Sequence, residues 1–174
     1  SLWLEALRPG RPLTFLDAHI KVGNALLGTT PALLAAGIPD TAFAPLTGDD
    51  RKCTASLRKR NQAERQDAET GTDQLDMFSD SGPSLSISTE RLRRKARDQA
   101  ATAPVSLAEV HLAARRHRAL REDPVYLRAR NTSDAWCAAF VQRKVPDAVT
   151  ITHDTLLAVD AGTAPAEVYS EVAA

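Results

Sequence analysis

The segment that most constrains the fold of this chain is residues 15–28, in which an apolar run ends at Gly23-Asn24 and further apolar residues follow at once. Such a pattern is typical of a short β-strand that leads into a ligand-facing loop of an α/β sheet. Ahead of it, residues 1–7 have the apolar spacing of the last turns of a helix, which Pro9 and Gly10 would end. Because the chain begins inside that pattern without a methionine, we expect it to be a piece of a longer protein.

The order of helix, Pro-Gly turn, strand and Gly-Asn loop resembles the adenine-specific DNA methyltransferases, including the methylase halves of type IIG restriction-modification enzymes. Residues 20–28 (IKVGNALLG) are similar to the family segment that passes the adenine ring of S-adenosylmethionine. Residues 2–5 (LWLE) resemble the stretch that follows the acidic loop holding the cofactor ribose. Residues 134–141 (DAWCAAFV) resemble a segment that lies shortly before the catalytic Asn-Pro-Pro-aromatic loop.

The resemblance implies a fragment of an α/β Rossmann-like methyltransferase, mainly α with a small β contribution, that carries a largely helical insertion. Its parent enzyme would methylate the N6 amine of adenine in DNA within a bacterial restriction-modification or phage-defence system. Neither the family's glycine-rich cofactor loop nor its Asn-Pro-Pro-aromatic loop occurs in the sequence. We therefore expect no catalytic residue in this chain and no activity from the chain alone.

Gly23 and Asn24 are the candidate cofactor-binding residues. The resemblance implies that the Asn24 amide hydrogen-bonds the edge of the S-adenosylmethionine adenine, while Gly23 gives the backbone room to turn. The residue pattern alone favours a plain turn, because Gly and Asn occur in turns of every fold. The resemblance favours the cofactor site.

Helix caps, prolines and a loop-forming stretch divide the chain into four expected segments. Residues 1–37 form the partial methyltransferase core, ending in a short helix that Thr30 caps and Pro31 begins. Residues 38–69 are a connector and a polar, basic helix over about 51–68, capped by Asp49 and Asp50. Residues 70–88 are rich in Gly, Ser, Asp, Thr and Pro, which predicts a flexible loop. Residues 89–174 are a helical insertion leading toward the missing catalytic motif.

Within that last segment, several helix boundaries are predicted. Ser106 and Glu109 form a capping box, so a helix begins at Ser106. Asp123-Pro124 ends this helix, residues 131–134 (NTSD) cap the next one, and the Pro146 region stops it. Two shorter helical pieces follow in the C-terminal tail.

Charge patterning points to nucleic acid only locally. The 22 basic and 22 acidic residues balance, so the chain as a whole has no net attraction for nucleic acid. Basic residues nevertheless cluster in segments 51–65, 91–97 and 115–121, and Arg58, Lys59 and Arg60 are the candidate nucleic-acid contacts. Two interpretations stay open. In the first, the clusters are solvated faces, and the aliphatic parts of the basic side chains cover apolar surface. In the second, they contact the phosphates of DNA while the target base is rotated out of the duplex.

One short motif suggests a protein partner. The pentapeptide Gln74-Leu75-Asp76-Met77-Phe78 resembles the segment by which several bacterial replication and repair proteins hold the ring-shaped sliding clamp. A local tether that pins the loop to its own domain is the alternative interpretation. The other expected partners are DNA and the remainder of the parent methyltransferase.

The remaining residues exclude several other kinds of site. His111 and His117 are six apart on a predicted helix and have no accompanying Cys pair, so we expect no metal site. Two distant cysteines without a signal peptide predict a reducing cytoplasm, and no apolar run approaches the roughly twenty residues of a membrane span. The alternative function is a non-enzymatic helical adaptor that binds nucleic acid or protein through its basic helices.

Overall fold

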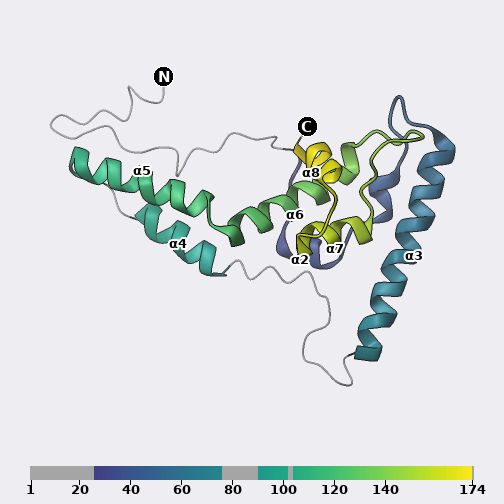
Figure 1. Ribbon diagram of the computed structural model, residues 1–174, viewed down its shortest axis with the longest axis horizontal. Coiled ribbons are helices and arrows are strands. Elements are labelled where there is room, and N and C mark those ends of the chain that lie inside the picture. The colour runs from purple at the N-terminus through teal and green to yellow at the C-terminus, as the bar shows by residue number, and fades with distance from the viewer. Residues whose placement is uncertain (1–25, 76–89, 102–103, 174) are drawn as a thin grey trace. The chain divides into compact units, whose positions relative to one another are not determined.

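A computed structural model describes residues 26–75, 90–101 and 104–173, and every regular element among them is a helix (Figure 1). In chain order these are α2 (Pro31–Ala35), the 3₁₀ helix η2 (Asp40–Phe43), α3 (Arg51–Leu75), α4 (Glu90–Ala101), α5 (Leu107–Arg121), α6 (Pro124–Val141), α7 (His153–Ala161) and α8 (Ala166–Ala173). The described residues divide into two compact units. The smaller unit contains residues 90–101 and 104–127, and the larger contains residues 26–75 and 128–173.

The expected fragment of an α/β Rossmann-like fold is wrong, because the described residues contain no strand and no sheet; only its mainly α character holds. The three β-branched residues Thr150, Ile151 and Thr152, a type that favours strands, show the physical reason. The central residue, Ile151, donates its amide to Gln142 Oε1 (2.8 Å) and accepts from Gln142 Nε2 (3.1 Å). A side-chain amide from the end of α6 thus occupies the backbone groups that a neighbouring strand would need. The predicted strand before Gly23 lies outside the described residues.

The core of the larger unit is built from segments far apart in the sequence. Leu34, Ile38 and Phe43 from the α2–η2 region pack with Trp136 of α6. Helices α7 and α8 complete it with Leu156, Val159 and Val168. Figure 1 shows α2, α7 and α8 gathered around the second half of α6, and α3 contacts both η2 and α7.

Three helix starts are confirmed as the sequence predicts them. Thr30 Oγ1 accepts the Leu33 amide (3.3 Å) ahead of α2. Asp50 Oδ1 accepts the amides of Lys52 (2.7 Å) and Cys53 (2.8 Å) ahead of α3. The capping box holds at α5, where Ser106 Oγ accepts the Glu109 amide (3.3 Å) and Glu109 Oε2 accepts the Val105 amide (2.6 Å). Each of these starts depends only on neighbouring residues.

The predicted start of the next helix at residues 131–134 is wrong, because α6 begins at Pro124. Asp123 caps it by accepting the Val125 amide (3.0 Å), so Asp123-Pro124 ends one helix and starts another. The expected cap residues lie inside α6, where Thr132 and Ser133 donate to the carbonyls of Arg128 (3.0 Å) and Ala129 (2.7 Å). Hydroxyls bonded four residues back fit within a helix.

Two segment boundaries also differ from the expected ones. Helix α3 continues to Leu75, past the predicted end near residue 68 and into the predicted loop of 70–88, with the Thr70 hydroxyl bonded to the Gln66 carbonyl (2.8 Å). Of the clamp-like pentapeptide, Gln74 and Leu75 end α3 and the other three residues lie outside the described residues. The two compact units also divide within α6, between Leu127 and Arg128, where no segment boundary was predicted.

Among the residues that the structure describes, no helix combines the length and the apolar character needed to cross a membrane.

Candidate functional site

The residues predicted to bind ligands fall into two groups. Gly23 and Asn24 lie outside the described residues, so their interactions stay predictions. Arg58, Lys59 and Arg60 lie in the first half of α3 and are exposed. Arg60 Nε bonds Glu64 Oε1 (2.6 Å) and Arg58 Nε lies 3.8 Å from Asp40 Oδ2. Of the three, only Lys59 has no ion-pair partner among the described residues.

A polar cluster joins α3 to the start of α7, and we call its residues, the buried Asn61, Glu64 and His153 and the exposed Asp154, the α3–α7 junction. Asn61 has no exposed surface; its Nδ2 donates to the Ile38 carbonyl (2.9 Å) and its Oδ1 accepts the His153 amide (3.0 Å). Glu64 Oε2 accepts the Asp154 amide (3.0 Å). Two side chains one turn apart on α3 therefore cap α7, whose own N-cap residue, Thr152, supplies no capping bond.

The electrostatics of the α3–α7 junction follow from its burial. Burial raises the pKa of Glu64 most strongly, but its bonds to the Asp154 amide and to Arg60 help to hold that pKa below its ordinary value. Burial, and next the charge of Glu64, raise the pKa of Asp154. Because the Glu64 carboxylate already occupies the positive N-terminus of α7, this helix end has no place for an anionic ligand.

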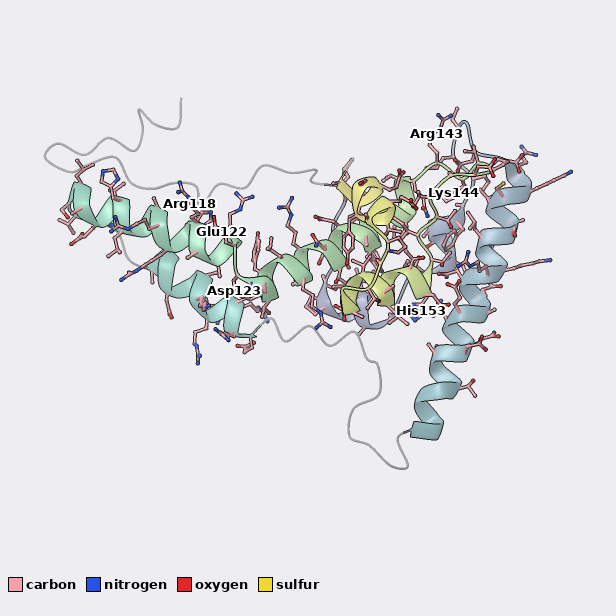
Figure 2. All side chains as sticks on the ribbon, viewed as in Figure 1. Arg118, Glu122, Asp123, Arg143, Lys144 and His153 are labelled. Carbon is pink, nitrogen blue, oxygen red and sulfur yellow. The ribbon has the colours of Figure 1, made fainter. Side chains whose placement is uncertain are left out.

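His153 is packed closely within the α3–α7 junction (Figure 2). The residue is 8% exposed, and its Nδ1 is buried without a hydrogen-bond partner among the described residues. Burial lowers the pKa of His153, Arg65 lowers it further, and the carboxylates of Asp154, Glu64 and Glu69 oppose the shift. The neutral ring is therefore the form that the fold accommodates.

Acidification is expected to destabilise the protein through His153. The unfolded chain takes up a proton at this residue near pH 6.5, while the folded chain, with its lowered pKa, does not. The free energy of unfolding should fall as the pH drops below about 6.5, by up to about 1.4 kcal/mol per pH unit from this one group. Above about pH 7.5 the effect vanishes.

Urea unfolding of the wild type and of His153→Gln at pH 7.5, 6.5 and 5.5 measures this dependence. The difference in unfolding free energy between the two proteins should change with pH, because the variant cannot take up the proton and keeps the backbone bond to Asn61. Parallel pH profiles for both proteins would show that His153 titrates alike in the folded and unfolded chain.

A second buried polar contact joins the loop before α3 to the loop after α6. Lys144 has no exposed surface, its Nζ lies 3.8 Å from Asp49 Oδ2, and it donates to the Gln142 carbonyl (3.3 Å). Asp49 also accepts the amides of Lys144 (3.0 Å) and Leu46 (2.9 Å). Figure 2 shows Lys144 beside Arg143 in the loop that follows α6.

The pKa values at this contact reflect a structural pair. Burial lowers the pKa of Lys144, while the charge of Asp49 opposes that shift. The amides of Lys144 and Leu46 hold the pKa of Asp49 below its ordinary value. Because the Lys144 ammonium is enclosed, a substrate does not reach it in this conformation. Asp49 was expected to cap α3; only Asp50 does so, and no local signal in the sequence distinguishes the two.

Among the described residues, no three His, Cys, Asp or Glu side chains gather closely enough to hold a metal ion. Comparison of the chain with protein-family models, with curated proteins and with solved structures gave no match. Evidence for function therefore comes from the residues of this chain and from their arrangement.

Proposed function

We propose that this chain is part of an S-adenosylmethionine-dependent DNA adenine N6-methyltransferase of a bacterial restriction-modification or phage-defence system. The proposal is supported by the two strings that resemble this family, residues 20–28 and residues 134–141. The first would lie beside the adenine of the methyl donor, with Asn24 as its hydrogen-bonding residue.

The observation that carries the proposal is a contact of the second string, residues 134–141, with a residue that follows the first string closely in the sequence. Trp136 Nε1 donates to the Gly37 carbonyl (3.0 Å), and Gly37 follows Gly28 by nine residues in the sequence. Ala135 and Ala139 of the same string have no exposed surface and lie in the core that Leu34 of α2 shares. The second string thus lies in the core of the larger unit, and the described residues of the first string, 26–28, precede α2 of that unit.

The proposed division of labour follows from the motifs that the sequence contains. The loops that would hold the methionine part of the cofactor and orient the adenine amine are not among these 174 residues. Methyl transfer between a bound donor and a bound base depends mainly on positioning, so these loops would belong to the remainder of the parent enzyme. This chain would contribute the Asn24 contact and surfaces that hold the DNA while the base is rotated out.

The direct test is the activity of the whole gene product. We expect the coding sequence to contain a glycine-rich loop before this region and Asn-Pro-Pro-Tyr or Asn-Pro-Pro-Phe after it. We also expect the purified protein to transfer a tritiated methyl group from S-adenosylmethionine to N6 of adenine in duplex DNA. A gene product without these motifs that transfers no methyl group would refute the proposal.

Replacing Asn24 with alanine in the whole gene product is expected to raise the Kd for S-adenosylmethionine about tenfold. The lost contact is one hydrogen bond to a neutral base edge, which contributes about 1 kcal/mol, and its partner on the adenine is left unsatisfied. Isothermal titration calorimetry measures the change. Asn131→Ala is the matched control, because the side chain of Asn131, within α6, makes no hydrogen bond among the described residues. Equal affinities of the two variants would favour a plain turn at Asn24.

The helical adaptor is the second candidate, and the helical structure of the described residues favours it. An adaptor would bind its partner without a methyl donor. A gene product that binds DNA but neither binds S-adenosylmethionine nor methylates DNA would support the adaptor against the enzyme.

A further inference from the structure

The neutral charge of the whole chain conceals a marked difference between its two units. The described residues of the smaller unit, 90–101 and 104–127, carry nine Arg and Lys side chains against five Asp and Glu. The described residues of the larger unit carry ten Arg and Lys side chains against thirteen Asp and Glu. Positive potential is therefore concentrated in the unit built from α4 and α5.

The packing of α4 against α5 leaves the basic side chains outside. Leu92 of α4 and Leu120 of α5 are the buried apolar residues of this unit, each 8% exposed, and α4 contacts α5. Lys95 Nζ bonds Asp123 Oδ2 (2.8 Å), which ties α4 to the end of α5 and uses one basic residue internally. The eight arginines of the unit remain exposed.

The arginines of α5 form a continuous surface. Arg115 and Arg118 are three residues apart and so share one face of the helix, with His111 four residues before Arg115. Arg116 and Arg121 lie on the neighbouring exposed flanks. Within the described residues none of these four arginines has an ion-pair partner, whereas Arg58 and Arg60 of α3 have one each. Their guanidinium groups are thus available to an external anion.

We propose that this surface, consisting of Arg115, Arg116, Arg118 and Arg121 on α5, binds the phosphates of duplex DNA. The inference rests on the proposed function, because a DNA adenine methyltransferase acts on a duplex. Arginine is the residue best suited to bind phosphate through two parallel hydrogen bonds, and the unit has eight arginines and one lysine.

The arginines on α5 are close enough together to contact neighbouring phosphates. Three residues of helix rise about 4.5 Å, and each DNA strand carries one phosphate per about 3.4 Å of its axis, a difference that long, flexible arginine side chains can span. Contacts of this kind position the protein and add affinity, but they carry no sequence information. The recognition of the methylation site would therefore lie elsewhere in the parent enzyme.

The test measures binding of the 174-residue chain to a fluorescein-labelled 20-bp duplex by anisotropy over a series of salt concentrations. Arg115→Gln/Arg118→Gln should raise the Kd at least tenfold and reduce the slope of log K against log salt by about 1.8, since each lost phosphate contact removes about 0.9. Circular dichroism and thermal unfolding check that the variant is folded. These two side chains are exposed, so its Tm should match that of the wild type.

Two further variants distinguish this surface from the alternatives. Glu122 is exposed one turn after Arg118, so Glu122→Gln should tighten DNA binding, which a folding defect cannot imitate (Figure 2). Arg58→Gln/Lys59→Gln removes two basic charges from α3 and should weaken binding less than the α5 variant does. A loss equal to that of the α5 variant would place the DNA on α3 instead and overturn the inference.

Two outcomes would separate the inference from the proposed function. A chain that does not bind the duplex at 50 mM salt, or that binds duplex RNA or an acidic peptide more tightly, would overturn the inference. Methyl transfer by the whole gene product would still support the proposed function in that case. The whole gene product could also lack methyl transfer, while its Arg115→Gln/Arg118→Gln variant binds DNA more weakly than the wild type. This result would support the DNA-binding surface on α5 and refute the proposed methyltransferase function.

Discussion

Replacing Gly37 with alanine is expected to lower the free energy of unfolding of the larger unit by about 2–5 kcal/mol. Two independent costs add at this position. Gly37 has a φ of +76°, a left-handed conformation that other residues adopt only with strain. An added Cβ would also lie 2.8 Å from both Cε1 and Nδ1 of His153, which is closer than nonbonded atoms approach. The alanine variant must therefore strain its backbone and displace a buried ring.

Gly162→Ala is the matched control for Gly37→Ala. Gly162 follows α7 with a φ of +75°, and nothing lies within 4 Å of its added Cβ, so only the backbone strain of about 1–2 kcal/mol remains. Urea unfolding followed by circular dichroism measures both variants. Adding His153→Ala to Gly37→Ala should recover part of the loss, because the smaller side chain removes the clash. Equal losses at Gly37 and Gly162 would show that the His153 contact costs nothing.

The second large effect is expected at Asp49. Lys144 has no exposed surface, and Asp49→Asn leaves its ammonium without a counterion. An unpaired buried charge typically lowers the free energy of unfolding by about 3–5 kcal/mol. The asparagine keeps an oxygen that can accept one of the backbone amides now bonded to Asp49. The loss in unfolding free energy, measured in urea at pH 7, therefore reports mainly the ion pair.

The partner substitution gives the control for this pair. Lys144→Met removes the ammonium and leaves the Asp49 carboxylate bonded to two backbone amides, so it should cost clearly less than Asp49→Asn. The double variant Asp49→Asn/Lys144→Met should be more stable than Asp49→Asn alone, since it contains no unpaired ammonium. Additive losses in the double variant would contradict the pairing of these two residues.

The sequence predicts those parts of the fold that neighbouring residues determine. Thr30, Asp50 and Ser106 each accept a backbone amide within three residues of themselves, and the helices begin where these caps indicate. Asp123-Pro124 is a local signal too, but it was interpreted only as the end of α5. A Pro at the first position of a helix accounts equally well for the start of α6.

The contacts that hold the larger unit together were not predictable, because they join residues far apart in the chain. The amides at the start of α7 are capped by Asn61 and Glu64, about ninety residues earlier. Periodicity within α3 identifies these two residues only as polar side chains on a polar helix. The expectation of a Rossmann-like fold came from the resemblance of residues 20–28, of which the structure describes only 26–28, and the helical residues that follow do not extend it.

The predicted nucleic-acid contacts stay predictions. Arg58, Lys59 and Arg60 are exposed, and the sequence could not show that two of them are paired with acidic residues. It also favoured the cluster that contains Arg58, Lys59 and Arg60 over the other two basic clusters. Only their placement in two units distinguishes the cluster on α5, whose arginines have no acidic partner among the described residues, from the cluster on α3.

The capping of α7 by residues of α3 has a consequence for the order in which the chain acquires structure. Helix α7 has nine residues, whereas isolated helices shorter than about twelve are marginal in water. Its first amides obtain their acceptors only when α3 is already in place against it. We therefore expect α7 to form late, because it depends on a distant part of the polypeptide, and we expect a chain lacking α3 to leave residues 153–161 without a stable helix.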